Sequence, residues 1–162
     1  MKKYNRIWIL GGTGSGKSFL AKRLSGKLSL PAHTTDFFVY SKDFKKKYSP
    51  EIKSRKILEV SKRKKWIIEG VHRADWILPA FDKSDFIIFI DTKVFTRLYR
   101  VFRREFFEKR VNLKSFPRII YYALIYFFDS RKHHLKMIRE RNKDFLFLKN
   151  KKEINEFLKE IK

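Results

Sequence analysis

Short apolar runs alternate with longer amphipathic stretches along the chain. Runs that are almost entirely apolar are typical of parallel strands buried on both faces, and they lie at residues 6–10, 66–68, 86–90 and 145–148. A short segment at 32–35, entered at Pro31, predicts one more strand. Between them, apolar residues recur at helical spacing, at residues 19–28, 52–60, 95–106 and 154–161. The alternation predicts an α/β fold of three layers around a five-stranded parallel sheet with right-handed crossovers.

A glycine-rich segment joins the first predicted strand to the first predicted helix. It holds four of the six glycines of the chain and fits the phosphate-loop pattern G-x-x-x-x-G-K-[ST]. We expect it to bind a nucleotide together with the residue that follows it; these positions are Gly11, Gly12, Thr13, Gly14, Ser15, Gly16, Lys17, Ser18 and Phe19. The alternative is a glycine-rich turn that binds nothing, and the strand before it and the helix after it argue against that alternative.

The residue types of this loop suit phosphate. Glycines allow backbone N–H groups to approach phosphate oxygens, and the N-terminus of the following helix favours an anion. Lys17 would bridge the β- and γ-phosphates, and the Ser18 hydroxyl would ligate Mg²⁺. The loop therefore predicts ATP and Mg²⁺ as the cofactors.

The composition is that of a globular protein with an unusual charge. Of 162 residues, 43% are apolar, none is cysteine, and 40 Lys and Arg against 17 Asp and Glu give a net charge of +23. We expect one domain over residues 1–162 without disulfides or thiolate metal sites. The N-terminus lacks the apolar core of a signal peptide, so we expect a cytoplasmic protein. The charge would attract polyanions, which leaves nucleic acid and anionic lipid open as partners beside a nucleotide; a merely solvated basic surface is the alternative.

The aromatic run at residues 119–128 is too short to cross a bilayer, which needs about twenty residues. We expect a helix packed on both sides. The alternative is an interfacial membrane helix, because Arg118 precedes it and Arg131, Lys132, His133 and His134 follow. Neighbouring side chains on a helix point about 100° apart, so the two histidines are expected to be exposed polar residues without a shared metal.

Several motifs together resemble the adenylate-kinase-like P-loop kinases. They are I-x-I-x-G-G-x-G-S-G-K-S-x-L-A at 7–21, L-P-x-H-x-x-D at 30–36, W-I-I-E-G at 66–70 and R-L-x-R-V-x-R-R at 97–104. Within that class, the chain looks most similar to the group labelled DNA topology modulation or adenylate-kinase-related proteins. The resemblance covers nearly the whole chain and implies the three-layer P-loop NTPase fold with a five-stranded parallel sheet, in a nucleoside- or nucleotide-kinase-like form with a helical basic lid.

The resemblance also implies roles for three residues near the acceptor. Nucleotide kinases of this kind typically carry D-G-x-P-R after the third strand, where this chain has Glu69, Gly70, Val71, His72 and Arg73. Glu69 would lie near Mg²⁺, and Arg73 would face an anionic group of the acceptor. Asp36 matches an acid that lies near the acceptor hydroxyl and the metal, so the implied metal site is Ser18, Glu69 and Asp36. His72 replaces a proline, which leaves the nature of the acceptor open.

Arginines in the second half of the chain resemble the lid that closes over the phosphates. Guanidinium groups stabilise the charge that builds up on a phosphoryl group during transfer, and the candidates are Arg97, Arg100, Arg103 and Arg104, with Arg139 and Arg141 as weaker ones. A solvated basic helix face is the alternative. Asp91, at the end of an apolar strand, is either a metal-site acid or a helix cap.

These predictions define an ATP- and Mg²⁺-dependent phosphotransferase with Lys17, Asp36, Glu69, Arg73, Arg97, Arg100 and Arg104 in catalytic roles. The acceptor would be a nucleotide, a nucleoside or a similar small metabolite, bound by an insert at 37–65 beneath a lid at 97–140. One alternative is a nucleic-acid-associated ATPase or a kinase of polynucleotide ends. Another is a peripheral membrane protein that docks through residues 118–134. The sequence leaves the acceptor and the oligomeric state open.

Overall fold

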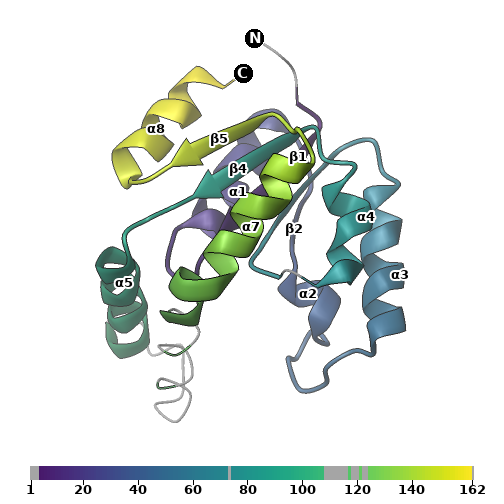
Figure 1. Cartoon of the computed structure of the whole chain (residues 1–162), viewed down its shortest axis with the longest axis horizontal. Coiled ribbons are helices and arrows are strands. Elements are labelled where there is room, and N and C mark those ends of the chain that lie inside the picture. The colour runs from purple at the N-terminus through teal and green to yellow at the C-terminus, as the bar shows by residue number, and fades with distance from the viewer. Residues whose placement is uncertain (1–3, 73, 108–116, 118–120, 122–123, 162) are drawn as a thin grey trace.

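Five parallel strands form one sheet in the computed structural model of the chain, which describes residues 4–72, 74–107, 117, 121 and 124–161. The strand order is β2-β3-β1-β4-β5, with bounds β1 (Arg6–Gly11), β2 (Ala32–Thr34), β3 (Trp66–Gly70), β4 (Phe86–Ile90) and β5 (Phe145–Leu148). The predicted fold class and all five predicted strands are confirmed. Because β1 lies in the centre, the loop that follows it lies between the ends of β3 and β4 (Figure 1).

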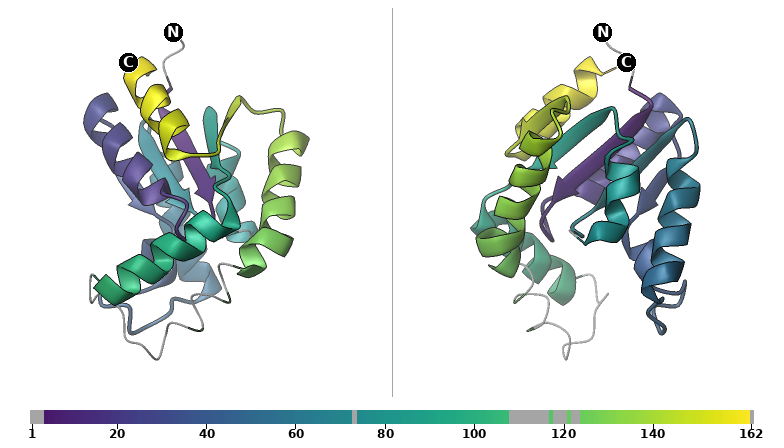
Figure 2. Two further views of the ribbon diagram at one scale, coloured as in Figure 1. Left: turned by 90° about the vertical axis from the view of Figure 1, so that its left-hand side faces the viewer. Right: turned by 45° about the vertical axis from the view of Figure 1, so that its right-hand side comes forward.

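Helices cover both faces of the sheet, as the two views of Figure 2 show. One face is covered by α1 (Lys17–Leu28) and α8 (Lys151–Glu160), and the other by α3 (Pro50–Ser61), α4 (Leu78–Phe81) and α7 (Arg131–Glu140). Shorter elements connect them, namely α2 (Asp36–Val39), the 3₁₀ turn η1 (Asp75–Ile77) and the π-helical turn η3 (Tyr126–Ser130). This is the three-layer arrangement expected when both faces of a parallel sheet are buried.

The alternation of side chains along the strands divides the core into two halves. From β1, Trp8 and Leu10 point to the α3–α4–α7 side, while Ile7 and Ile9 point to the α1–α8 side, and all four are fully buried. Each of the aliphatic side chains among them contributes about 1.5–3 kcal/mol on leaving water. The central strand that carries the glycine loop is therefore anchored from both sides.

The helix α5 (Val94–Phe107) follows β4 beyond the end of the sheet (Figures 1 and 2). The sequence predicts an apolar face on it, but Phe95 and Phe102 of that face are exposed to solvent. The side that packs on the protein carries Arg97, which is only 2% exposed, and Val101. The helix therefore packs with its arginine side inward, where Arg97 and Arg100 contact backbone carbonyls of the glycine loop.

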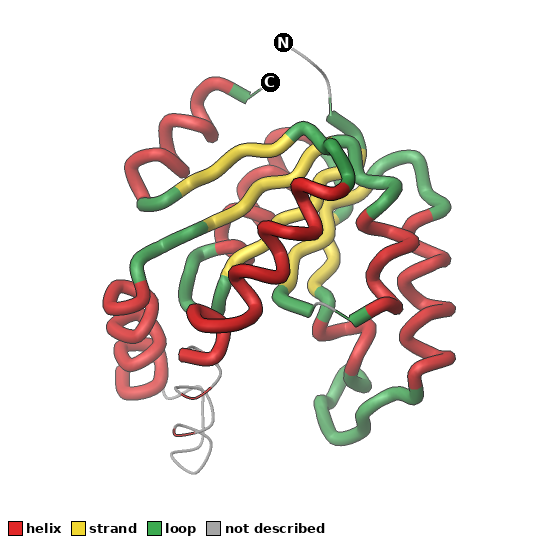
Figure 3. The backbone as a smooth tube through the Cα atoms, viewed as in Figure 1, coloured by secondary structure: helices red, strands yellow, loops and turns green. Residues whose placement is uncertain are grey.

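The loop between α2 and α3, drawn green in Figure 3, folds back on itself. Tyr40 and Lys47 form an isolated antiparallel bridge. The Ser41 N–H donates to the Lys46 carbonyl at 2.8 Å, and the Tyr48 N–H donates to the Val39 carbonyl at 2.8 Å. These contacts close the segment into a small hairpin.

The aromatic run 119–128 lies partly outside the described residues, which omit 118–120 and 122–123. Within the run, Tyr121 and Leu124 are exposed and Tyr126 is buried, so Tyr121 and Leu124 do not fit the expected packing on both sides. Among the residues that the structure describes, none of the helices has the length and apolar character needed to cross a bilayer.

Candidate active site

The glycine loop turns tightly from β1 into α1. Gly14 and Gly16 have φ angles of +78° and +101°, a region that L-residues with a Cβ rarely adopt. The Ser15 N–H donates to the Gly12 carbonyl at 3.1 Å, and the helix bonding begins with the Leu20 N–H on the Gly16 carbonyl at 3.0 Å. The glycines therefore sit where the predicted phosphate cradle requires them.

Side chains of α5 donate hydrogen bonds to backbone carbonyls of this loop. The Arg97 Nε donates to the Thr13 carbonyl at 3.1 Å, and the Arg100 Nη1 donates to the Ser15 carbonyl at 3.2 Å. The Arg97 guanidinium also lies 4.8 Å from the centre of the Tyr126 ring. A Cβ on Gly12 would collide with both Arg97 and Tyr126. Burial lowers the pKa of Arg97 from its ordinary value, yet an arginine at this position stays charged. The loop carbonyls are what draw the arginine side of α5 inward.

Lys17 begins α1 between two acidic side chains. Its Nζ donates to the Gly12 carbonyl at 3.5 Å. Burial lowers the pKa of Lys17, and the nearby carboxylates of Glu69 and Asp36 act in the opposite direction. The amine is held beside the loop, where a bound phosphate would add the negative charge that favours its protonated form.

Two residues that the sequence predicts as metal ligands are in contact. The Ser18 hydroxyl donates to Glu69 Oε1 at 2.8 Å, and Glu69 is buried at the end of β3. The described residues contain no cluster of three or more His, Asp or Glu side chains that could hold a metal alone. Mg²⁺ in nucleotide sites takes one or two protein oxygens besides phosphate and water, so this hydroxyl–carboxylate pair fits it.

Asp36 stands at the start of α2, directly after β2. Parallel pairing of Thr34 with Glu69, and a 2.8 Å hydrogen bond from the Thr35 N–H to the Glu69 carbonyl, bring it beside the end of β3. Its carboxylate lies 3.6 Å from His72 Nε2. The nearby imidazole lowers the pKa of the Asp36 carboxyl, against a smaller opposing effect of burial. Asp36 is therefore an ionised group at neutral pH.

A cavity of about 680 Å³ opens over the glycine loop. It brings together most of the predicted site: Thr13, Gly14, Gly16, Lys17, Ser18, Phe19, Asp36, Glu69, Arg100, Arg103 and Arg104. Arg97 does not line this cavity; its Nε donates to the Thr13 carbonyl instead. Arg73 lies outside the described residues. Three arginines and a lysine thus face one cavity with two carboxylates.

A second cavity of about 560 Å³ adjoins the first. Thr13, Asp36 and Val71 line both, so Asp36 stands at the junction. The rest of the second cavity is formed by aromatic rings and cations that sequence reasoning did not single out as site residues, among them Tyr40, Trp76, Tyr126, His72, Lys47 and Lys53. They come from four separate segments, and their meeting could be found only from the fold.

Two further predictions are settled by contacts across the chain. Asp91 neither caps α5 nor lines these cavities; it forms a two-pronged ion pair with Arg131, at 2.8 Å and 2.6 Å. His133 is exposed as expected, but the expectation of an exposed His134 is wrong. His134 is fully buried, and its Nε2 lies 3.3 Å from the His72 carbonyl oxygen.

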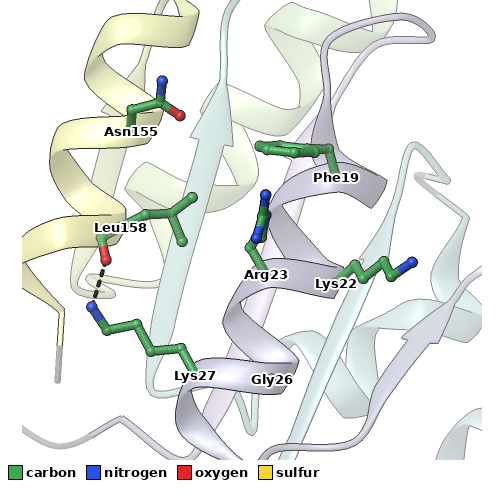
Figure 4. A pocket seen from close by; sticks show the side chains of 7 residues that line it. All are labelled: Phe19, Lys22, Arg23, Gly26, Lys27, Asn155 and Leu158. Carbon is green, nitrogen blue, oxygen red and sulfur yellow. Dashed lines mark hydrogen bonds between the residues drawn. The ribbon is translucent and has the colours of Figure 1, made fainter.

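A third cavity, of about 830 Å³, runs between α1 and α8 (Figure 4). Lys22, Arg23 and Lys27 line it, and the Arg23 guanidinium lies 5.5 Å from the centre of the Phe19 ring. The Lys27 amine donates to the Leu158 carbonyl at 2.6 Å. Phe19 lines both this groove and the cavity over the loop, so a cationic groove reaches the edge of the phosphate cradle.

Comparisons with known proteins agree with the fold. No protein-family model matches the chain, and a search of curated proteins also gave no match. Solved structures do match it over nearly its whole length. Shikimate kinase from Acinetobacter baumannii, in complex with shikimate, has a TM-score of 0.61 at 14% identity, covering 96% of this chain and 89% of that one.

Two further shikimate kinases are similar to the chain. The enzyme from Bacteroides thetaiotaomicron has a TM-score of 0.67 at 13% identity and covers 97% and 96% of the two chains. The enzyme from Aquifex aeolicus has a TM-score of 0.54 at 21% identity and covers 96% and 92%. At these identities the likeness shows the fold alone, which the chain shares with these three enzymes; it does not single out the topology modulation group.

Proposed function

We propose that the chain is an ATP- and Mg²⁺-dependent phosphotransferase acting on a nucleotide, a nucleoside or a similar small metabolite. The observation that carries this proposal is the pair of cavities that meet at Asp36. A glycine-loop cavity alone would suit any nucleotide-binding protein. A second, separate cavity across a carboxylate gives a place for an acceptor, and phosphoryl transfer needs donor and acceptor in line.

On the donor side, the loop residues 11–18 would hold the phosphates of ATP through backbone N–H groups, with Lys17 on the β- and γ-phosphates. Ser18 and Glu69, 2.8 Å apart, would hold Mg²⁺ with Asp36 nearby. When bound, Mg²⁺ would neutralise charge on the transferring phosphoryl group. Arg100, Arg103 and Arg104 face the same cavity and would stabilise the equatorial oxygens in the transition state.

On the acceptor side, the ionised Asp36 carboxylate would accept a hydrogen bond from the acceptor hydroxyl and orient its oxygen toward the γ-phosphate. Rings of Tyr40, Trp76 and Tyr126 together with the amines of Lys47 and Lys53 line the chamber. This lining suits a hydroxylated molecule with a flat apolar face and an anionic group. Arg73, outside the described residues, remains a proposed contact of that group.

The finer sequence expectations belong to the same proposal. We retain a single domain with an acceptor-side insert at 37–65 and a basic lid at 97–140, a cytoplasmic location, and kinship with the topology modulation group. The acceptor panel should include shikimate, because one neighbour of the same fold was solved with it.

A second candidate is a nucleic-acid-associated ATPase, favoured by the groove in Figure 4, where three cations and the Phe19 ring lie beside the phosphate cradle. A charged groove with an aromatic ring is typical of single-strand binding. It predicts an affinity for oligonucleotides that falls steeply with salt and that Lys22→Ala with Arg23→Ala weakens.

The deciding experiment is ATP turnover with Mg²⁺ against nucleotides, nucleosides, shikimate and short oligonucleotides. Lys17→Ala should lower the rate about 10²- to 10³-fold, while Lys64→Ala, which removes the same charge from an exposed position, should not. A phosphorylated small product establishes the kinase. Free phosphate released only with DNA or RNA present supports the second candidate, and equal rates for Lys17→Ala and wild type refute both.

A further inference from the structure

The outward face of α5 carries a line of exposed aromatic side chains. Phe95, Tyr99 and Phe102 are 81%, 65% and 43% exposed. Spacings of four and three residues place them within about 60° of one another around the helix. Such a line on a helix is ordinarily turned into a core, and here it faces solvent.

The helix cannot turn this line inward without releasing the glycine loop. Its opposite side carries Arg97 and Arg100, whose guanidinium groups donate to the carbonyls of Thr13 and Ser15, and the fully buried Val101. The same contacts that fix the phosphate loop therefore hold the aromatic line on the outside.

We propose that α5 docks on the surface of an anionic lipid bilayer through Phe95, Tyr99 and Phe102. Exposed aromatic rings on a helix insert at the boundary of headgroups and acyl chains, and cationic surface around them strengthens binding to anionic lipid. The net charge of +23 supplies the attraction to anionic headgroups, which act on basic residues within about a Debye length. Arg103 is exposed and follows Phe102 by about a quarter of a turn, so it lies between the aromatic line and the cavity over the glycine loop, which it also lines.

Charge disfavours the other occupants of this face. A second copy of the chain would bring two strongly cationic molecules together, at a cost in repulsion. A nucleic-acid strand would need cations along the same face as the rings, and Arg97 and Arg100 point the opposite way, to the loop carbonyls. A bilayer needs cations only around the rings.

Docking through this face leaves the nucleotide site open to water. The glycine loop contacts the side of α5 that is opposite to the rings, so the bilayer and the phosphate cradle would lie on different sides of one helix. The proposal is therefore independent of the phosphotransferase activity, and neither depends on the outcome of the other.

The test is sedimentation of the full chain with vesicles at physiological ionic strength. One set is phosphatidylcholine alone and the other is phosphatidylcholine with phosphatidylglycerol in equal parts. The double variant Phe95→Ser, Tyr99→Ser is compared with Phe37→Ser, Phe44→Ser, which removes two aromatic rings that are 54% and 56% exposed elsewhere. Circular dichroism confirms that both variants are folded, which their exposed positions favour.

We expect the wild type to sediment with the anionic vesicles and not with phosphatidylcholine alone. The α5 variant should bind at least about tenfold more weakly, and the control variant should bind like the wild type. A wild type that stays in the supernatant overturns the proposal. Equal binding by both variants also overturns it, because charge alone would then account for adsorption. A wild-type dimer that the α5 variant dissociates, without vesicle binding, assigns the face to a second copy and overturns it as well.

Discussion

Gly70→Ala is expected to separate the two acidic segments of the site. A Cβ at Gly70 would overlap three atoms of Thr35, with Cγ2 at 2.6 Å and Cβ at 2.7 Å. A change of the Thr35 rotamer moves Oγ1 and Cγ2 away, but not Cβ. Bringing that last contact from 2.7 Å to the ordinary 3.4 Å requires the two backbones to part by about 0.7 Å. Overpacking of this kind costs about 1–3 kcal/mol of folding free energy.

The same displacement should reach the chemistry, because Gly70 follows Glu69 and Thr35 precedes Asp36. A misplacement near 1 Å in an active site costs about 10²-fold in rate, so we expect kcat to fall about 10- to 100-fold. Stability is measured by urea unfolding with linear extrapolation. Gly26→Ala is the control, since a Cβ there meets nothing within 4 Å and a helical alanine should stabilise α1 by about 0.5–1 kcal/mol.

A double-mutant cycle sharpens this prediction. Adding Thr35→Ala to Gly70→Ala removes Oγ1 and Cγ2 but leaves the Thr35 Cβ, so stability should recover only in part relative to Thr35→Ala alone. Full recovery would mean that the backbones do not have to move. Wild-type stability and turnover in Gly70→Ala would refute the close approach itself.

The remaining predictions concern charge. Arg131→Gln should destabilise the chain by about 0.5–1.5 kcal/mol, because it removes the two-pronged pair that raises the pKa of Arg131 and leaves Asp91 half-buried without it; urea unfolding that is unchanged would contradict this. Asp36 has a lowered pKa in the folded chain, so its favourable contribution is present above the unfolded pKa, about 4, and is lost as the pH falls through the folded value. Asp36→Asn should therefore be less stable than wild type at neutral pH and approach it in acid; a difference that stays constant with pH would refute the assignment.

The sheet and the glycine loop were predictable because each depends on neighbouring residues. Apolar runs such as 86–90 allow few alternatives to a buried strand. The glycines at 14 and 16, just before Lys17, are what permit the conformation of the loop, so the motif itself predicts it. Glu69 and Asp36 were predicted from the resemblance to nucleotide kinases, and the parallel pairing of β2 with β3 brings their two segments side by side.

The orientation of α5 and the burial of His134 could not be predicted in this way. Periodicity shows that a helix has two faces, but not which face the fold requires. On α5 the side that packs on the protein is the one whose arginines donate to the carbonyls of Thr13 and Ser15, not the one with the aromatic rings. The sequence near residue 97 gives no sign of these distant carbonyls. His134 is buried because its ring reaches the carbonyl of His72, a residue 62 positions away. Such contacts between distant segments also assemble the proposed acceptor cavity.

The two walls of the proposed site belong to parts of the fold with different freedom to change. The proposed donor wall is the glycine loop, which directly follows the central strand β1. A substitution in β1 disturbs the core on both faces of the sheet. The proposed acceptor wall includes the hairpin at residues 40–48. The backbone hydrogen bonds of this hairpin are made within the segment itself and to the carbonyl of Val39, which directly precedes it. Such a segment can be exchanged as a cassette without rebuilding the sheet. Selectivity for the acceptor can therefore evolve, or be engineered, while the machinery for the donor is kept.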